Sequence, residues 1–89
     1  MKRIVSVSEV AGEGLVKLLG EEVILFCTNY NYTGILIGVN DDCVLLQGAS
    51  IVFETGAFSA SEWKDAQRLP NKEHYVMRGG IESFGVVEV

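Results

Sequence analysis

The chain has few of the residues that build cross-linked or metal-bound small proteins. It contains two cysteines, Cys27 and Cys43, and a single histidine, His74. Two cysteines cannot form the multi-bridge framework of a small disulfide-rich domain, and their spacing does not match a zinc site. We therefore expect no metal, and we interpret both cysteines as small buried apolar residues within strands.

Long hydrophobic runs are also missing. The longest stretch without a charge, residues 23–40, is interrupted by the polar residues 28–31, which excludes a transmembrane helix. The first six residues include two basic ones but no long apolar core, so they do not resemble a signal peptide. We therefore expect a cytoplasmic protein that does not contact a membrane.

Positive charge is scarce. Seven Lys and Arg stand against twelve Asp and Glu, which gives a net charge of −5. An acidic surface repels phosphate, so any contact with nucleic acid has to be local and cannot arise from general electrostatic attraction.

Catalytic and cofactor motifs are absent from the sequence. None of the serines stands in a nucleophile motif. Asp41 and Asp42 are adjacent at a turn, where their side chains point apart. The spacing of Gly12, Gly14 and Lys17 lacks the third glycine and the strand–turn–helix context of a phosphate-binding loop. We therefore expect neither an enzyme nor a bound cofactor.

What the chain does have is apolar content. Hydrophobic residues make up 48% of its 89 residues, which form one domain over 1–89. A chain of this length buries only about 60–65% of its unfolded surface on folding. Either much apolar surface stays exposed, or a partner covers it.

The first part of the chain has helical periodicity. Apolar residues recur at three- and four-residue spacing over residues 7–20, Ser6 and Glu9 form a capping-box pattern, and Gly20 suits the end of a helix. Two internal glycines weaken this helix by roughly 1 kcal/mol each relative to alanine. The pattern predicts an N-terminal helix with a weakened first half.

From residue 22 onward the pattern changes to that of strands. Gly34 and Gly38 lie on one face of the second predicted strand and indicate sharp curvature, as a small barrel needs. The fold class is therefore mainly β: an N-terminal helix followed by a strongly bent five-stranded antiparallel sheet, a small partly open barrel. The predicted strands cover residues 23–27, 32–39, 43–47 with a possible extension over 51–53, 75–78 and 81–89.

One long segment interrupts the strands. Residues 57–74 are small, polar or charged, and they predict an exposed excursion in which Trp63 serves as a local packing anchor. Pro70 ends any helix in this segment.

Two segments resemble the motifs of Sm and Sm-like (LSm) proteins. Residues 23–46, centred on Gly-Ile-Leu-Ile-Gly-Val-Asn at 34–40, resemble the first Sm motif, and the bacterial Sm-type RNA chaperone (Hfq) has a similar one. Residues 75–81, Tyr-Val-Met-Arg-Gly-Gly-Ile, resemble the second motif, in which apolar residues lead into Arg-Gly. The resemblance implies the bent five-stranded sheet that the strand pattern also predicts.

The resemblance also implies assembly. Sm-like proteins form cyclic homo-oligomers, here about five to seven subunits, in which residues 75–78 pair with the final strand of the neighbour. The apolar last strand agrees, because such an edge aggregates unless another strand pairs with it. The subunit interface is thus expected at Tyr75, Val76, Met77, Phe84, Val86 and Val87.

The RNA site of the family transfers less completely. The resemblance places Asn40, Asp42, Val44, Arg78 and Gly79 at the pore, but Asp42 replaces the base-stacking residue of the family and Val44 replaces its base-reading asparagine. We expect Arg78 to pair with the Asp42 carboxylate. Two interpretations stay open: a scaffold or assembly ring with a degenerate RNA pocket, or a ring that binds single-stranded uridine-rich RNA.

Overall fold

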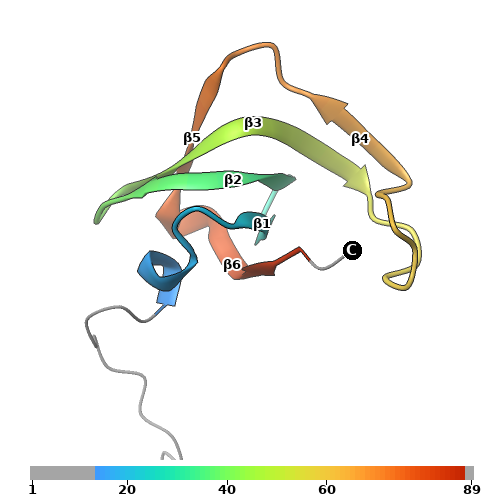
Figure 1. Ribbon diagram of the computed structural model, residues 1–89, viewed down its shortest axis with the longest axis horizontal. Coiled ribbons are helices and arrows are strands. Elements are labelled where there is room, and N and C mark those ends of the chain that lie inside the picture. Colours follow the sequence, from blue (N-terminus) through green and yellow to red (C-terminus); the bar gives the residue numbers. More distant parts are fainter. Residues whose placement is uncertain (1–13, 88–89) are drawn as a thin grey trace, which may run out of the picture.

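The chain folds into an antiparallel sheet, described here for residues 14–87 of a computed structural model. The strand order is β4-β3-β2-β1-β6, and β5 pairs with β3 beside β4 (Figure 1). The mainly β class predicted from the sequence is therefore correct. In chain order the elements are η1 (Gly14–Leu18), β1 (Glu22–Cys27), β2 (Asn31–Val39), β3 (Cys43–Glu54), β4 (Asp65–Arg68), β5 (Glu73–Met77), η2 (Arg78–Gly80) and β6 (Ile81–Val86).

The predicted N-terminal α-helix is wrong over its described part. A five-residue 3-10 helix, η1, takes its place, and residues 7–13 of the prediction lie outside the described residues. Gly14 has a φ angle of +69°, which the interior of a right-handed helix does not accommodate, whereas the φ of +89° at Gly20 is one that a glycine at a helix end adopts. Leu15 of η1 is nevertheless buried, so this turn still contributes to the core.

The predicted meander of β1, β2 and β3 is confirmed. Each of these strands pairs antiparallel with the next, with Val23 opposite Gly34 and Leu36 opposite Leu46. The expected break at residues 48–50 does not end the third strand, which runs on to Glu54. Gly48 has a φ of +64°, a left-handed backbone conformation that glycine adopts readily, and the strand continues beyond it.

The segment 57–74 was wrongly predicted to lack strands. It contains β4, which pairs with the second half of β3, while β5 pairs with the first half. The described residues thus form six strands rather than five. All four residues of β4, Asp-Ala-Gln-Arg, are exposed, so the alternation of apolar and polar residues that identifies a half-buried strand is missing.

The sheet is neither closed nor strongly curled, which corrects the predicted strongly bent barrel. No ladder joins β6 to β4 or β5 within residues 14–87. The two glycines of β2 instead lie at irregularities of the β2–β3 register. A Cβ atom on Gly34 would lie 3.2 Å from the Ala49 Cα atom, so this glycine permits a close approach of two backbones.

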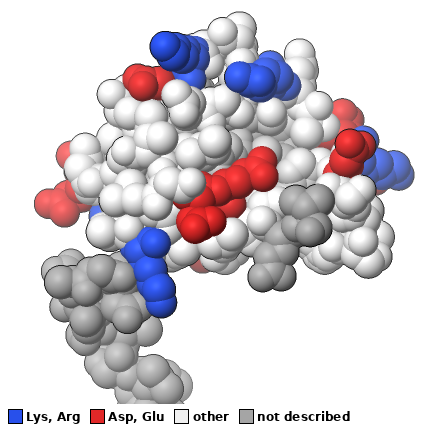
Figure 2. Space-filling model, viewed as in Figure 1, with Lys and Arg blue, Asp and Glu red and all other residues white. Residues whose placement is uncertain are grey.

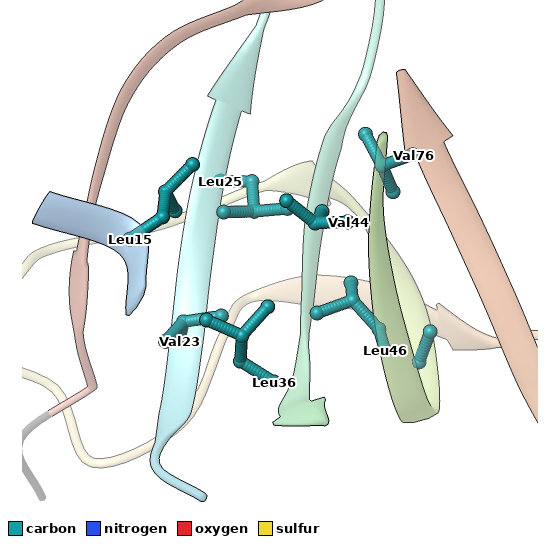
Figure 3. Close-up of a cluster of buried hydrophobic side chains, with 8 residues drawn as sticks. Leu15, Val23, Leu25, Leu36, Val44, Leu46 and Val76 are labelled. Atoms are coloured by element: carbon teal, nitrogen blue, oxygen red, sulfur yellow. The ribbon is translucent and has the colours of Figure 1, made fainter. Parts of the chain in front are cut away.

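The main core cluster lies on one face of the sheet, and Ile24 and Val52 are buried outside it. Figure 3 shows side chains from η1, β1, β2, β3 and β5 converging there. Thr33 is the one buried polar residue among the described residues, and its hydroxyl donates to the Val23 carbonyl at 2.9 Å. No helix within residues 14–87 has the length and apolarity needed to cross a bilayer. The clustered core residues are Leu15, Val23, Leu25, Leu36, Val44, Leu46, Ala49 and Val76.

Candidate functional site

The turn between β2 and β3 is fixed by one asparagine side chain. The Asn40 Oδ1 atom accepts hydrogen bonds from the main-chain N–H groups of Asp42 at 2.8 Å and Cys43 at 2.9 Å. The Asn40 N–H in turn donates to the Cys43 carbonyl at 3.0 Å. Asparagine suits this position because its side chain can replace a backbone partner in a tight turn. The acceptor oxygen of Asn40 is therefore used within the turn.

Arg78 joins this turn to the end of β5. Its main-chain N–H donates to the Asp42 carbonyl at 2.8 Å, and its guanidinium Nη1 donates to the Asn40 carbonyl at 2.7 Å. The expected ion pair between Arg78 and the Asp42 carboxylate does not form. An exposed carboxylate gains little from such a pair, whereas the Asn40 carbonyl lies within direct reach of the guanidinium.

The five residues predicted for RNA binding do not share one surface. Asn40, Asp42 and Arg78 lie together and are exposed, and a Cβ atom added to Gly79 would meet open space. Val44 is completely buried in the core, opposite Val76. Its side chain can therefore contact no ligand in this conformation.

The residues predicted for the subunit interface divide into exposed and buried ones. Tyr75 and Met77 on β5 are 65% and 66% exposed, and Phe84 and Val86 on β6 are 41% and 40% exposed. Val76 belongs to the core and Val87 is half-buried. Within residues 14–87 three strands, β4, β5 and β6, have an outer side without a partner strand, and the exposed members lie on β5 and β6.

A groove of about 340 Å³ lies between the loop after β3 and strands β1 and β6. Ile24 and Phe26 of β1 line it together with Val86 and Val87, and the Phe58 ring meets the Phe26 ring edge-on at a centroid distance of 6.5 Å. The sequence interpretation missed this groove. The available signal was the presence of aromatic residues in an otherwise polar loop, and Trp63 lines the groove.

A second hollow, of about 280 Å³, lies near the end of β5. Tyr30, Tyr32 and Tyr75 contribute to its lining, and the His74 ring stacks on the Tyr32 ring at 5.5 Å. Cys27 also lines it, and burial, followed by the negative charge of Glu82, raises the pKa of its thiol. This thiol therefore stays protonated and is a poor nucleophile.

The prediction that both cysteines are buried is wrong. Cys27 and Cys43 are both free and half-buried rather than fully buried. Within residues 14–87 no group of three His, Cys, Asp or Glu side chains could hold a metal ion.

The comparisons with known proteins found no match, neither to a protein-family model nor to a curated protein. The resemblance to Sm-like proteins therefore depends on the two motifs in the sequence. The turn at residue 40 and Arg78, which those motifs supply, are in direct contact.

Proposed function

We propose that this chain is an Sm-like protein that assembles into a closed homo-oligomeric ring and acts as a scaffold without a base-reading pocket. One observation carries the proposal. Among the three described strands with an unpaired outer side, β4, β5 and β6, only β5 and β6 expose large apolar side chains next to that unpaired backbone. An apolar strand edge of this kind needs a partner strand, because it otherwise promotes aggregation.

The backbone of β6 supplies one half of the contact. The Val87 N–H donates to the Glu22 carbonyl at 2.8 Å, so Val87 faces β1. Backbone groups of successive residues point to opposite sides of a strand. Phe84 and Val86 therefore direct their N–H and C=O groups away from β1, toward the open edge.

The backbone of β5 supplies the other half. The Arg78 N–H donates to Asp42 on the β3 side, in register with the pairing of Met77 and Cys43. By the same alternation, Tyr75 and Met77 direct their N–H and C=O groups away from β3. The residues with free backbone groups on β5 thus also carry its two exposed apolar side chains.

The two edges match when they are paired antiparallel between copies. In such a pair, residues that exchange hydrogen bonds stand directly opposite each other, with side chains on the same face. Tyr75 then faces Val86 of the next copy, and Met77 faces Phe84. Because each contact joins the β5 edge of one copy to the β6 edge of the next, the contact repeats head to tail. A head-to-tail contact that closes produces a ring.

A scaffold role is favoured over RNA binding by the state of the pocket residues. The Asn40 acceptor oxygen is used within its turn, the Arg78 guanidinium donates to a main-chain carbonyl, and Val44 is buried. The net charge of −5 adds no attraction for phosphate.

The substitution Val86→Pro tests the assembly. Proline removes an N–H that no group within residues 14–87 of the same subunit accepts, so the fold should survive, since proline is tolerated at edge strands. We expect sedimentation velocity to show the wild type as one discrete oligomer and the variant as a folded monomer. An oligomer of unchanged size in Val86→Pro would contradict the proposed edge pairing.

Val87→Pro is the matched control. It deletes the donor of the bond to Glu22 within the subunit, so it should lower the unfolding temperature far more than Val86→Pro does. Circular dichroism of both variants at the same protein concentration checks this order.

Uridine-rich RNA binding is the second candidate, favoured by the contact between Arg78 and Asn40 at the predicted pore. We expect fluorescence anisotropy to show only weak binding of a labelled oligouridine to the wild type, and little change in Arg78→Ala. Tight binding by the wild type that is lost in Arg78→Ala would establish RNA recognition and contradict a pure scaffold role. Measuring at low and moderate salt separates local contacts from general charge attraction.

A further inference from the structure

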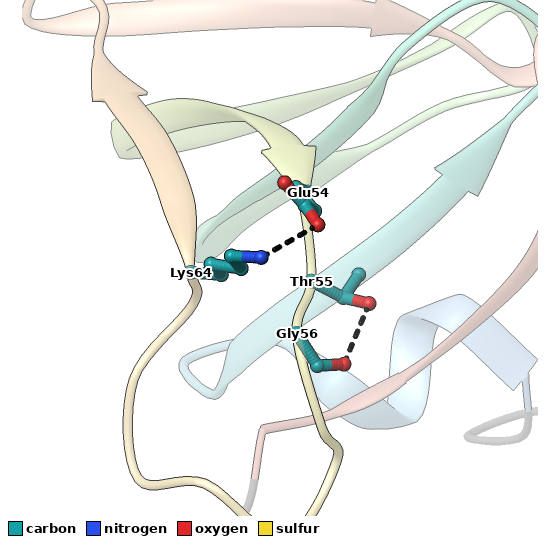
Figure 4. A network of polar contacts seen from close by, with 4 residues as sticks. All are labelled: Glu54, Thr55, Gly56 and Lys64. Carbon is teal, nitrogen blue, oxygen red and sulfur yellow. Dashed lines mark hydrogen bonds and ion pairs between the residues drawn. The ribbon is translucent and has the colours of Figure 1, made fainter.

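The groove beside β6 is a preformed part of the surface. The loop that covers the groove connects β3 to β4. An ion pair between Lys64 and Glu54, at 3.1 Å, joins the two ends of this loop (Figure 4). Next to this pair the Lys64 N–H donates to the Thr55 carbonyl at 3.3 Å. Phe58, at 77% exposure, leaves one wall of the groove open to solvent.

The groove lies on the face of the sheet opposite the core. Ile24, which lines it, is flanked in β1 by the core residues Val23 and Leu25 and therefore points away from the core. Gly85 stands opposite Ile24 and shares its face. The groove thus adjoins the open edge of β6 on that face.

The antiparallel pairing between copies determines which residues of the neighbouring copy lie next to the groove. When Tyr75 is opposite Val86 of the next copy, His74 is opposite Val87 of that copy. Val87 lines the groove. Side chains alternate along β5, so His74 lies on the groove side of the paired edge, and Lys72 lies in the bend just before this strand. The corner between β4 and β5, residues 69–72, is therefore brought to the mouth of the groove.

The charges of the two edges are complementary. Four of the five Lys and Arg between residues 14 and 87 lie within residues 64–78, together with two carboxylates. The β6 side has carboxylates at Glu82 and Glu22 and at Glu62 on the groove, and residues 81–87 contain no Lys or Arg. In Figure 2, Lys and Arg side chains lie over the β4–β5 connection at the top, and Asp and Glu side chains gather in the middle of the face.

We propose that the groove is a docking site for a second copy of this chain: it receives the β4–β5 corner of the neighbour, with the neighbour's Lys72 beside Glu62. The inference rests on the proposed ring and adds to it a contact outside the paired strands. The apolar floor packs against the exposed Pro70 of the corner, while the neighbouring Leu69 packs against the core of its own subunit. The ion pair favours head-to-tail contact and disfavours contact between two β6 edges, which would place like charges together.

Charge exchange tests this contact. Lys72→Glu and Glu62→Lys should each raise the protein concentration for half-assembly by about three- to tenfold, and the double variant in one chain should return it to near the wild-type value. Lys17→Glu on η1, which makes the same change in net charge as Lys72→Glu, is the matched control for that variant and should leave assembly unchanged. Sedimentation velocity over a dilution series gives these concentrations.

Trp63 gives an independent signal, because it is the only tryptophan and lines the groove. Its emission should shift to shorter wavelength as the wild type assembles, since docking removes water from the indole. If the wild type assembles while its emission stays constant, and the charge variants assemble like the wild type, the groove contact is overturned and the ring stands. If the wild type remains a monomer at every concentration, the proposed ring itself is overturned, and the groove contact with it.

Discussion

Replacing Gly34 by valine should destabilise the fold severely. A Cβ atom at this position would lie 3.2 Å from the Ala49 Cα atom, the Gln47 carbonyl oxygen and the Leu46 Cβ atom. Two of these are backbone atoms held by the β2–β3 ladder, so they cannot move aside as a flexible side chain can. We expect a loss of about 3 kcal/mol or more in the free energy of unfolding, measured by urea denaturation.

Gly38→Ala is the graded control for this prediction. An added Cβ atom there would meet only the Leu45 side chain, at 3.3 Å from its Cβ atom and 3.9 Å from its Cδ2 atom. Gly34→Ala should therefore cost clearly more than Gly38→Ala. Equal effects at the two glycines would show that the close approach at Gly34 does not limit the fold.

Leu36→Ala should have the second large effect. Leu36 has no exposed surface and packs in the central cluster opposite Leu46 (Figure 3). Truncating a buried leucine costs about 2–5 kcal/mol, because it removes apolar contacts and leaves a cavity. This is a large part of the roughly 5–15 kcal/mol that stabilises a typical domain.

Ile35→Ala provides the comparison within the same strand. Ile35 points to the other face of β2 and is 41% exposed, so its truncation should cost about 1 kcal/mol or less. All variants need the same protein concentration, because assembly couples to stability by mass action. A similar loss for Leu36→Ala and Ile35→Ala would contradict the placement of the main core cluster on the Leu36 face of the sheet.

The strands that were predicted well are those in which burial imposes a pattern. β1, β2 and β3 are rich in apolar residues and bounded by asparagine turns, so their order and antiparallel pairing followed from the sequence. The helix prediction failed over its described part because Gly14, inside the apolar pattern, has a positive φ. β4 escaped detection because all four of its residues are exposed, so no alternation of buried apolar residues marks it as a strand.

The sequence predicted two residues of the candidate site but not the hydrogen bond between them. The motif resemblance selected Asn40 and Arg78, and these residues are in contact. The sequence could not decide which acceptor the Arg78 guanidinium would reach. Every residue carries a main-chain carbonyl, so the residue type does not indicate that this group is the acceptor. The groove at Trp63 was equally inaccessible, because it forms between a loop and strands that are far apart in the chain.

Native mass spectrometry of the unmodified 89-residue chain tests whether the subunits close into a ring. The subunit mass is 9.7 kDa, and we expect one dominant species at an integral multiple of it, about five to seven subunits, without a ladder of intermediate sizes. A closed ring gives one size because every β5 edge is paired with a β6 edge, whereas open head-to-tail chains give a continuous series. A well-behaved 9.7 kDa monomer at micromolar concentration, or an unlimited series of multiples, would contradict the closed ring.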